Sequence, residues 1–447
     1  MKKKYFGTDG IRGAVGSSYI NPEFILRLGN AVGQVFIAHN PHRGQNPTVI
    51  LGKDTRISGY MLEAALQAGL TSAGVDVLLS GPLPTPGISY LTRALRLNGG
   101  VVLSASHNAY SDNGIKFFTE DGLKLSDAME LEIERTLQDP ISYVAPDHFG
   151  RAKRIDGAAE RYIEFCKSTF PSDLNLYNLK LVVDTANGAA YSVAPKVFHE
   201  LGAQVISIGA EPDGFNINRK VGATFINTLQ VAVLENKADY GIALDGDGDR
   251  LIMVDRYGSI HDGDSLLYVI AKARHQAKCL KGNGVVGTVM TNIGMENALR
   301  EISVDFVRSN VGDRYVLGKL LEKKWQVGGE ASGHILCLDK HITGDGIISA
   351  LQTFASLNIL DQDLATVRKD WVAYPQVIRN VRVRPFETWR EKSQVSIERA
   401  EKELSGGLGR VVVRASGTEP LVRVMVEAKR FEQAERLAQM ISEAMVN

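Results

Sequence analysis

Short apolar runs alternate with amphipathic segments along most of this chain. An apolar run at 49–51 is followed by a helical pattern at 61–73 and a second run at 75–79. The alternation returns further on, with runs at 179–183, 241–244, 285–289 and 304–307 and helix-length segments at 189–201 and 265–275. Buried runs joined by helices are typical of parallel β-α-β units, because a parallel crossover needs the length of a helix. We therefore predict a succession of α/β units.

The length and the last quarter of the chain indicate several domains. At roughly 150 residues per domain, 447 residues suggest three or four. Three of the runs end in small polar turns, at 52–56, 184–188 and 291–294, which indicates similar units. Beyond 370 the pattern changes to strands at 377–383, 410–414 and 421–426 with helices at 389–404 and 431–445. We predict α/β domains at 1–152, 153–255 and 256–370, and an α+β domain at 371–447.

Charge and cysteine content exclude several classes of protein. The 51 Lys and Arg balance 51 Asp and Glu, so the chain has no net attraction to nucleic acid or to an anionic membrane. The three cysteines are far apart in sequence, which predicts neither disulfides nor a zinc site. The basic start lacks a following signal-like apolar stretch, and no run approaches the roughly 18 apolar residues of a membrane span. We expect a soluble, cytoplasmic protein with neither nucleic acid nor a membrane as partner.

The sequence Asp-Gly-Asp-Gly-Asp-Arg at 245–250 directly follows the apolar run at 241–244. Its carboxylates, at alternate positions of an extended segment, lie on one side, and the glycines let the backbone bend around an ion. Oxygen ligands favour Mg²⁺ or Ca²⁺. An EF-hand is excluded because its glycine and glutamate positions hold Arg250 and Arg256. A solvated acidic turn is the alternative, but the end of a strand is where α/β sheets bind ligands.

A second apolar run, at 99–103, leads into Ser-Ala-Ser-His-Asn at 104–108. A hydrolase nucleophile is one interpretation of Ser106, but the G-x-S-x-G elbow is absent and the adjacent His107 would point away from it. A serine close to clustered carboxylates and a cation can instead carry a phosphoryl group. This interpretation requires the serine loop and the aspartates to meet in space.

Two further loops have the composition of small-molecule sites. The turn at 414–418 holds an arginine, two hydroxyls and a glycine, a combination that binds phosphate but is also common in ordinary turns. The loop at 328–334 contains Glu330, Ser332 and His334; this histidine is either a general acid or base or a structural residue. Neither the Walker A nor the G-x-G-x-x-G nucleotide-binding pattern occurs.

Taken together with the stretches at 6–13 and 112–118, these four loops resemble those of the α-D-phosphohexomutase superfamily, over essentially the whole chain. The resemblance implies three α/β domains with mixed sheets and a C-terminal α+β domain around a central cleft. The stretches at 6–13 and 338–346 look like the branch that acts on glucosamine phosphates. The implied reaction interconverts glucosamine 6-phosphate and glucosamine 1-phosphate through a phosphoserine and a 1,6-bisphosphate, and supplies UDP-N-acetylglucosamine and cell-wall synthesis.

The resemblance also implies a role for each site residue. Phospho-Ser106 carries the phosphoryl group and joins Asp245, Asp247 and Asp249 around Mg²⁺. Lys116 and Arg250 neutralise charge, and Lys116 or His334 moves the proton, with Lys116 favoured. The implied substrate contacts are Arg12, His107, Glu330, Ser332, Arg414, Ser416, Gly417 and Thr418. Glucosamine 1,6-bisphosphate or glucose 1,6-bisphosphate is the implied activator, and the enzyme is expected as a monomer or a homodimer.

Two positions depart from the family pattern, and three other functions compete with the implied one. Ala109 stands where the family commonly has proline, which leaves the serine loop less rigid, and Ala415 stands where close relatives often have lysine. A sugar phosphatase would use the same metal and phosphate groups, and a sugar-phosphate sensor would bind without turnover. Phosphomannomutase or phosphoglucomutase activity is the nearest alternative within the superfamily.

Overall fold

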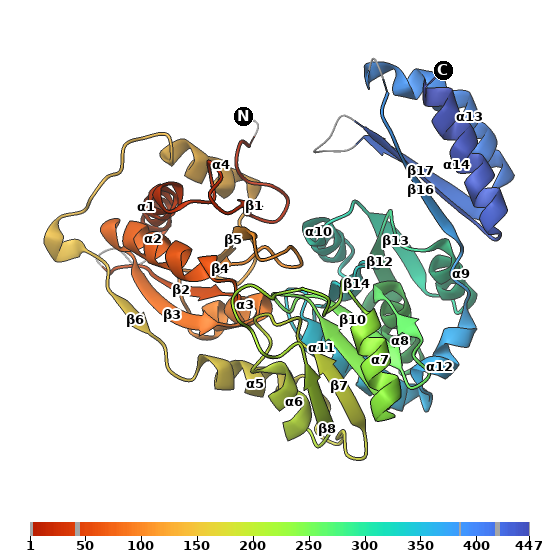
Figure 1. The fold of residues 1–447 in the computed structure, drawn as a ribbon, viewed down its shortest axis with the longest axis horizontal. Coiled ribbons are helices and arrows are strands. Elements are labelled where there is room, and N and C mark those ends of the chain that lie inside the picture. Colours follow the sequence, from red (N-terminus) through yellow and green to blue (C-terminus); the bar gives the residue numbers. More distant parts are fainter. Residues whose placement is uncertain (1–2, 41–44, 384–385, 416–420, 447) are drawn as a thin grey trace.

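A computed structural model describes residues 3–40, 45–383, 386–415 and 421–446, which form four units, each built on its own sheet (Figure 1). The first sheet has the order β1-β5-β4-β2-β3-β6, in which β2, β3, β4 and β6 run parallel and β5 runs antiparallel to β4 and β1. Its strands are β1 (Ile11–Ala14), β2 (Thr48–Lys53), β3 (Asp76–Pro82), β4 (Gly99–Leu103), β5 (Asp112–Thr119) and β6 (Ala152–Arg154). Its helices are α1 (Pro22–Ala38), α2 (Ser58–Ser72), α3 (Thr85–Ala94) and α4 (Asp127–Thr136).

The second and third units are also mixed sheets, ordered β11-β10-β9-β7-β8 and β13-β12-β14-β15. The second contains α5 (Ala158–Ser168), β7 (Lys180–Asp184), α6 (Ala194–Glu200), β8 (Gln204–Ile208), α7 (Asn227–Asn236), β9 (Tyr240–Leu244), β10 (Leu251–Asp255) and β11 (Ile260–His261). The third contains α8 (Gly263–Gln276), β12 (Gly284–Thr288), α9 (Ile293–Glu301), β13 (Asp305–Ser309), α10 (Asp313–Lys323), β14 (Val327–Gly329), β15 (Ile335–Cys337), α11 (Gly346–Leu360) and α12 (Leu364–Val367).

The fourth unit is an antiparallel sheet of order β16-β18-β17 covered by two helices. Its elements are β16 (Gln376–Val381), α13 (Trp389–Glu403), β17 (Gly409–Ala415), β18 (Val422–Ala428) and α14 (Phe431–Val446). The fold class predicted from the sequence, three α/β units with mixed sheets and a C-terminal α+β unit, is confirmed. The four domain ranges stay a proposal, with two boundaries moved: β6 extends the first sheet to Arg154 rather than 152, and β11 extends the second sheet to His261 rather than 255.

Each of the three α/β units contains the same hairpin. A buried strand ends, a polar loop follows, and the chain returns antiparallel to the strand it has just left, in the pairs β4–β5, β9–β10 and β14–β15. The serine loop, the aspartate loop and the Glu330 loop are these three connections. The repeated topology therefore gives the three candidate loops equivalent positions in their units.

One predicted helix is shorter than expected. The pattern at 189–201 forms a helix only from Ala194, because the preceding residues pack against the aspartate loop. The amide of Ala189 donates to the carbonyl of Gly246 at 2.8 Å, and a Cβ on Gly188 would lie 2.3 Å from that carbonyl oxygen. By contrast, α1 has a regular start, at which Asn21 caps the helix by accepting from the Phe24 amide.

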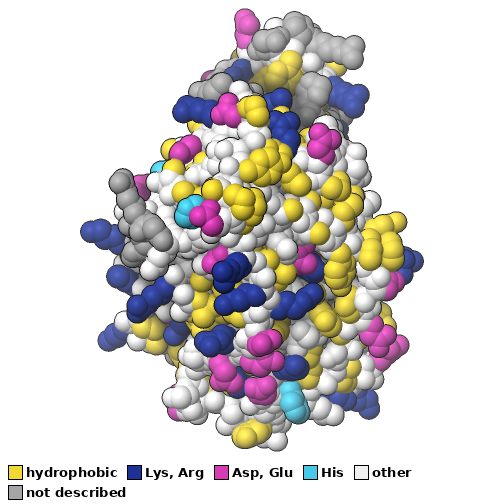
Figure 2. All heavy atoms as spheres, turned by 90° about the vertical axis from the view of Figure 1, so that its left-hand side faces the viewer, with side chains coloured by type: hydrophobic (Ala, Val, Ile, Leu, Met, Phe, Trp, Pro, Cys, Tyr) yellow, Lys and Arg dark blue, Asp and Glu magenta, His cyan; other side chains and the backbone are white. Residues whose placement is uncertain are grey.

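One hydrophobic cluster extends through the first three units, and the first unit has a second cluster of its own. The fourth unit has a separate cluster, which includes Trp389, Val424 and Leu437. The fourth unit stands apart from the first (Figure 1) and is tied to the third by Arg410, which donates to the carbonyls of Val289 and Thr291 at 2.7 and 2.8 Å. Within the described residues, no helix combines the length and the apolar character that crossing a bilayer requires. On the face shown in Figure 2, acidic and basic side chains are interspersed.

Removing one buried hydroxyl should weaken the packing of the second unit against the third. Tyr162, fully buried on α5, donates to Asp345 at 2.8 Å, and Asp345 also caps α11. Burial raises the pKa of Asp345 to about 6. We expect Tyr162→Phe to lower the free energy of unfolding by about 1–3 kcal/mol in chemical denaturation, because a buried acceptor loses its donor. Tyr177→Phe, at a tyrosine that is 67% exposed, is the control and should cost less than about 0.5 kcal/mol.

Candidate active site

The serine loop and the aspartate loop meet in the structure. The hydroxyl of Ser106 donates to Oδ2 of Asp245 at 2.6 Å, although the two residues lie 139 positions apart. Ser106 is 1% exposed and has a left-handed backbone, with φ of +51°. The close approach explains Gly246, because a Cβ there would lie 2.4 Å from the carbonyl oxygen of Ser106. The condition on which the phosphoryl-carrier interpretation depended is therefore met.

Three buried carboxylates form the centre of this site. Asp245, Asp247 and Asp249 each place one oxygen within 4.8 Å of the other two. Burial and repulsion by the other two carboxylates raise the pKa of Asp245 to about 8. Among the described residues, Oδ1 of Asp247 and Oδ1 of Asp249 are buried without a hydrogen-bond partner. Clustered oxygen acceptors with unused lone pairs fit a hard divalent cation, so this trio could hold a metal ion.

Lys116 is the buried cation that faces the trio. Its ammonium lies 2.7 Å from Asp247, 3.5 Å from Asp249 and 3.3 Å from Asp9. Burial disfavours the charged amine, but these carboxylates outweigh burial and raise the pKa of Lys116. Asp247 also accepts from Thr85 at the start of α3, at 2.5 Å. The side chain from β5 is thus held as a cation beside the aspartate loop.

A chain of alternating charges continues from Lys116 through three units and returns to the trio. Asp9 contacts both Lys116 and Lys124, and Lys124 contacts Asp313 at the start of α10. His334 closes the ring, 3.7 Å from Asp313 and 3.7 Å from Asp249. Burial disfavours the imidazolium, but Asp249 and Asp313 outweigh it and raise the pKa of His334 to about 9. The two carboxylates therefore favour the protonated imidazole of His334.

Three further side chains named from the sequence lie near the serine. The amide of Arg250 donates to Asp245 at 3.2 Å. Arg12 pairs with Asp9, while its Nε is buried without a hydrogen-bond partner among the described residues. The expectation that His107 points away from the serine is wrong, because its Nδ1 lies 3.3 Å from the Ser106 hydroxyl. Burial, with Arg250 and Arg12 nearby, lowers the pKa of His107 to about 4. It is therefore neutral at pH 7 and can act as a hydrogen-bond partner without adding charge.

Of the residues expected in the sugar-binding loop (328–334) and the phosphate-binding loop (414–418), only some of those that the structure describes lie near the trio. In the Glu330 loop, His334 reaches the trio, Ser332 is exposed, and Glu330 accepts from the Gly312 amide at 2.9 Å. Arg414, near the end of β17, makes no hydrogen bond or ion pair with the trio or with Ser106 in the described part of the chain. The other three phosphate-loop residues, Ser416, Gly417 and Thr418, lie outside the described residues.

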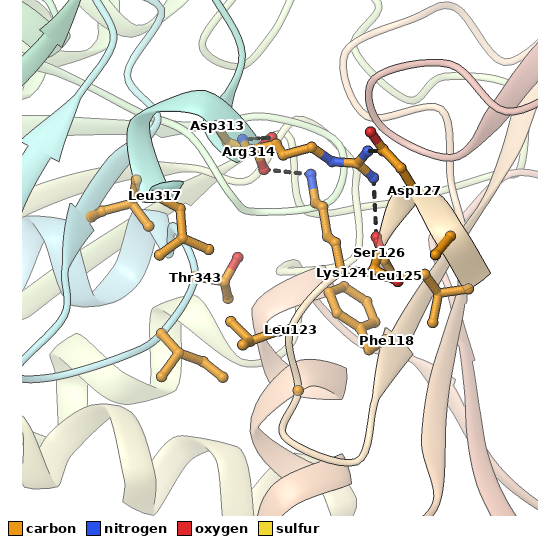
Figure 3. Close-up of a pocket in the computed structure, with 14 residues that line it drawn as sticks. Phe118, Leu123, Lys124, Leu125, Ser126, Asp127, Asp313, Arg314, Leu317 and Thr343 are labelled. Atoms are coloured by element: carbon orange, nitrogen blue, oxygen red, sulfur yellow. Dashed lines mark hydrogen bonds and ion pairs between the residues drawn. The ribbon is translucent and has the colours of Figure 1, made fainter. Parts of the chain in front are cut away.

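Sequence reasoning did not single out Asp9, Lys124 or Asp313. Asp9 lies in the stretch 6–13, which was noted only as part of the resemblance, and Lys124 and Asp313 belong to no motif. Lys124 and Asp313 also line a cavity of about 470 Å³ between the first and third units. Figure 3 shows Lys124 directed toward Asp313, with Leu123 and Leu317 on the cavity wall. Two residues of the charged ring thus lie on the wall of this cavity.

All four units of the chain match the domains of one protein family. Residues 3–143, 160–258 and 262–374 match "Phosphoglucomutase/phosphomannomutase, alpha/beta/alpha" domains I, II and III, and residues 366–444 match the C-terminal domain. The chain therefore belongs to the phosphoglucomutase/phosphomannomutase family of the phosphohexomutase superfamily, and the resemblance stated from its sequence is confirmed.

Within this family the chain groups with the phosphoglucosamine mutases, which are isomerases. It is 64% identical over 445 residues to "Phosphoglucosamine mutase" from Neisseria meningitidis serogroup C, covering 100% of this chain and 99% of the relative.

Two solved structures share the fold. A phosphoglucomutase/phosphomannomutase family protein from Burkholderia thailandensis superposes with a TM-score of 0.81 at 23% identity, over 98% of this chain and 96% of that one. An N-acetylphosphoglucosamine mutase from Aspergillus fumigatus, solved in complex with GlcNAc-6P and magnesium, gives 0.68 at 17% identity, over 100% and 96%.

Proposed function

We propose that this chain interconverts glucosamine 6-phosphate and glucosamine 1-phosphate through phospho-Ser106 and a 1,6-bisphosphate intermediate. The observation that carries the proposal is the 2.6 Å hydrogen bond between the Ser106 hydroxyl and the buried aspartate trio. The 64% identity to phosphoglucosamine mutase over the full chain supports glucosamine as the sugar. We place the reaction in the cytoplasm, where it supplies UDP-N-acetylglucosamine and cell-wall synthesis.

Transfer of the phosphoryl group from Ser106 to the sugar requires neutralisation of its negative charge and movement of one proton. In the first half-reaction, the bond from phosphorus to Ser106 Oγ breaks and a bond to the free sugar hydroxyl forms. The sugar hydroxyl loses a proton and Ser106 Oγ gains one. Arg250 and Lys116 neutralise charge on the phosphoryl group, since the guanidinium of Arg250 interacts with all three carboxylates of the trio and Lys116 contacts Asp247. We assign the proton transfer to Lys116 rather than to His334, because Lys116 contacts Asp247 directly whereas His334 stands 3.7 Å from Asp249. Since Lys116 is a cation, it donates a proton to Ser106 Oγ as the phosphoryl group leaves and takes one back from the sugar hydroxyl.

The trio and the serine oxygen would hold Mg²⁺. The unpartnered oxygens of Asp247 and Asp249 fit that role, as does the repulsion that raises the pKa of Asp245. An ion held there would supply positive charge that stabilises the phosphoryl group during its transfer. Glucosamine 1,6-bisphosphate or glucose 1,6-bisphosphate would serve as activator by phosphorylating Ser106.

Substrate recognition is shared between units. Glu330 and Ser332 bind sugar hydroxyls, and Arg12 and His107 contact the substrate next to Ser106. The distal phosphate is bound by Arg414 together with Ser416, Gly417 and Thr418. Since the fourth unit has its own core and stands apart from the first, it approaches as a body to complete the site, and it withdraws to let the bisphosphate turn around.

A comparison of sugar 6-phosphates tests this function. With trace bisphosphate and Mg²⁺, we expect kcat/KM for glucosamine 6-phosphate to exceed that for glucose or mannose 6-phosphate at least about tenfold, because a site with a polar contact for the amine rejects a hydroxyl. Phosphate release should stay below about 1% of the rate of sugar 1-phosphate formation. If phosphate release were as fast as sugar 1-phosphate formation, the enzyme would be a phosphatase rather than a mutase. A preference for mannose or glucose 6-phosphate would identify a different substrate.

A further inference from the structure

Arg56, in the turn after β2, directs four of its five guanidinium N–H groups at the serine loop and the first residue of β5, and the fifth at Asp54. Nε donates to Asp54 at 2.9 Å, and the other four N–H groups donate to main-chain carbonyls. Those carbonyls belong to Ser106 (3.0 Å), Asn108 (2.9 Å), Ala109 and Asp112 (3.1 Å). Arg56 is 0% exposed. With all five of its donors engaged, it has none left for a substrate.

Asp54, which pairs with Arg56, is also linked through Ser104 to the main-chain amide of Ser106. Asp54 accepts from the hydroxyl of Ser104 at 2.6 Å, and Oγ of Ser104 accepts from the amide of Ser106 at 2.9 Å. From the second unit, Asn218 donates to the carbonyls of Ser106 and Asn108 at 2.9 and 3.0 Å. Both the amide and the carbonyl of Ser106 are therefore fixed by buried or partly buried side chains.

The loop needs such support. Residues 104–111 form no helix or strand, Ser106 is left-handed, and Ala109 lacks the restricted φ that a proline would give. We propose that Arg56 is a positioning residue. Its hydrogen bonds fix the backbone conformation of the serine loop and thereby direct the Ser106 hydroxyl at Asp245. This inference rests on the proposed function, because it assigns Arg56 a role only if Ser106 carries the phosphoryl group.

The test compares two buried arginines that each pair with an aspartate. Arg56→Lys keeps the charge but loses the fork of donors, whereas Arg274→Lys makes the same change on α8, where Arg274 contacts Asp339 at 2.7 Å and Gln352 at 3.1 Å. We expect Arg56→Lys to lower kcat at least 100-fold while KM changes less than threefold and the Mg²⁺-induced rise in Tm is retained. Arg274→Lys should lose Tm to a similar degree but keep kcat within threefold of wild type.

Ser104→Ala provides a milder variant in case Arg56→Lys does not fold. It removes the link between Asp54 and the Ser106 amide, and we expect kcat to fall about tenfold with KM unchanged. The inference is overturned if folded Arg56→Lys or Ser104→Ala keeps wild-type kcat, or if the loss of kcat in Arg274→Lys equals that in Arg56→Lys. Measuring the activity of Ser106→Ala separately distinguishes the two failures. If Ser106→Ala is inactive, the proposed function stands even where the role of Arg56 fails.

Discussion

Ser106→Ala should reduce mutase activity more than about 1,000-fold, which corresponds to more than about 4 kcal/mol of transition-state stabilisation. The phosphoryl group loses its carrier, and no other hydroxyl among the described residues hydrogen-bonds to Asp245. The variant should still bind Mg²⁺, since the three carboxylates remain. Initial rates with saturating bisphosphate, together with intact-mass measurement of protein phosphorylation, check both parts.

Ser111→Ala is the matched control for this variant. Ser111 is an exposed hydroxyl in the same loop, and its replacement should leave the rate within about twofold of wild type. Wild-type turnover by Ser106→Ala, or phosphorylation of that variant at the wild-type level, would place the carrier elsewhere.

The aspartate trio could be predicted because its chemistry is local. Asp245, Asp247 and Asp249 follow one another at fixed spacing after a buried run, so the sequence itself places their oxygens together. Similarly, the periodicity that predicts α8 or β9 is a property of a short segment. The hydrogen bond from Ser106 to Asp245 is different, because it joins two units whose packing no local pattern describes.

The charged ring could not be predicted for the same reason. Lys124 and Asp313 belong to different units, and each looks like an ordinary surface charge in sequence; only the packing of the first unit against the third buries them together. The antiparallel return strands were also missed. The segment that forms β5 begins with Asp-Asn-Gly, which favours a turn, and its pairing with β4 depends on the sheet as a whole.

Asp247→Asn should abolish the response to Mg²⁺ and lower activity at least about 100-fold. The substitution preserves an oxygen that can accept from Thr85 but removes the charge that faces Lys116 and the cation. With Mg²⁺ at about 100 times its dissociation constant, linkage predicts about 2.7 kcal/mol of added stability for the wild type. For Asp247→Asn we expect less than about 1 kcal/mol under the same conditions, measured by chemical denaturation with Mg²⁺ and with EDTA.

Asp184→Asn separates loss of the metal from loss of a buried aspartate. Asp184 is fully buried at the end of β7 and accepts from the amides of Gly222 and Ala186 at 2.7 and 2.9 Å, so its replacement should cost about 1–3 kcal/mol of stability. Because Asp184 is outside the trio, the gain from Mg²⁺ should remain that of the wild type. If Asp247→Asn instead kept the full stability gain from Mg²⁺, the cation would have to bind without Asp247. The repulsion among the three carboxylates would then have to be neutralised by another group.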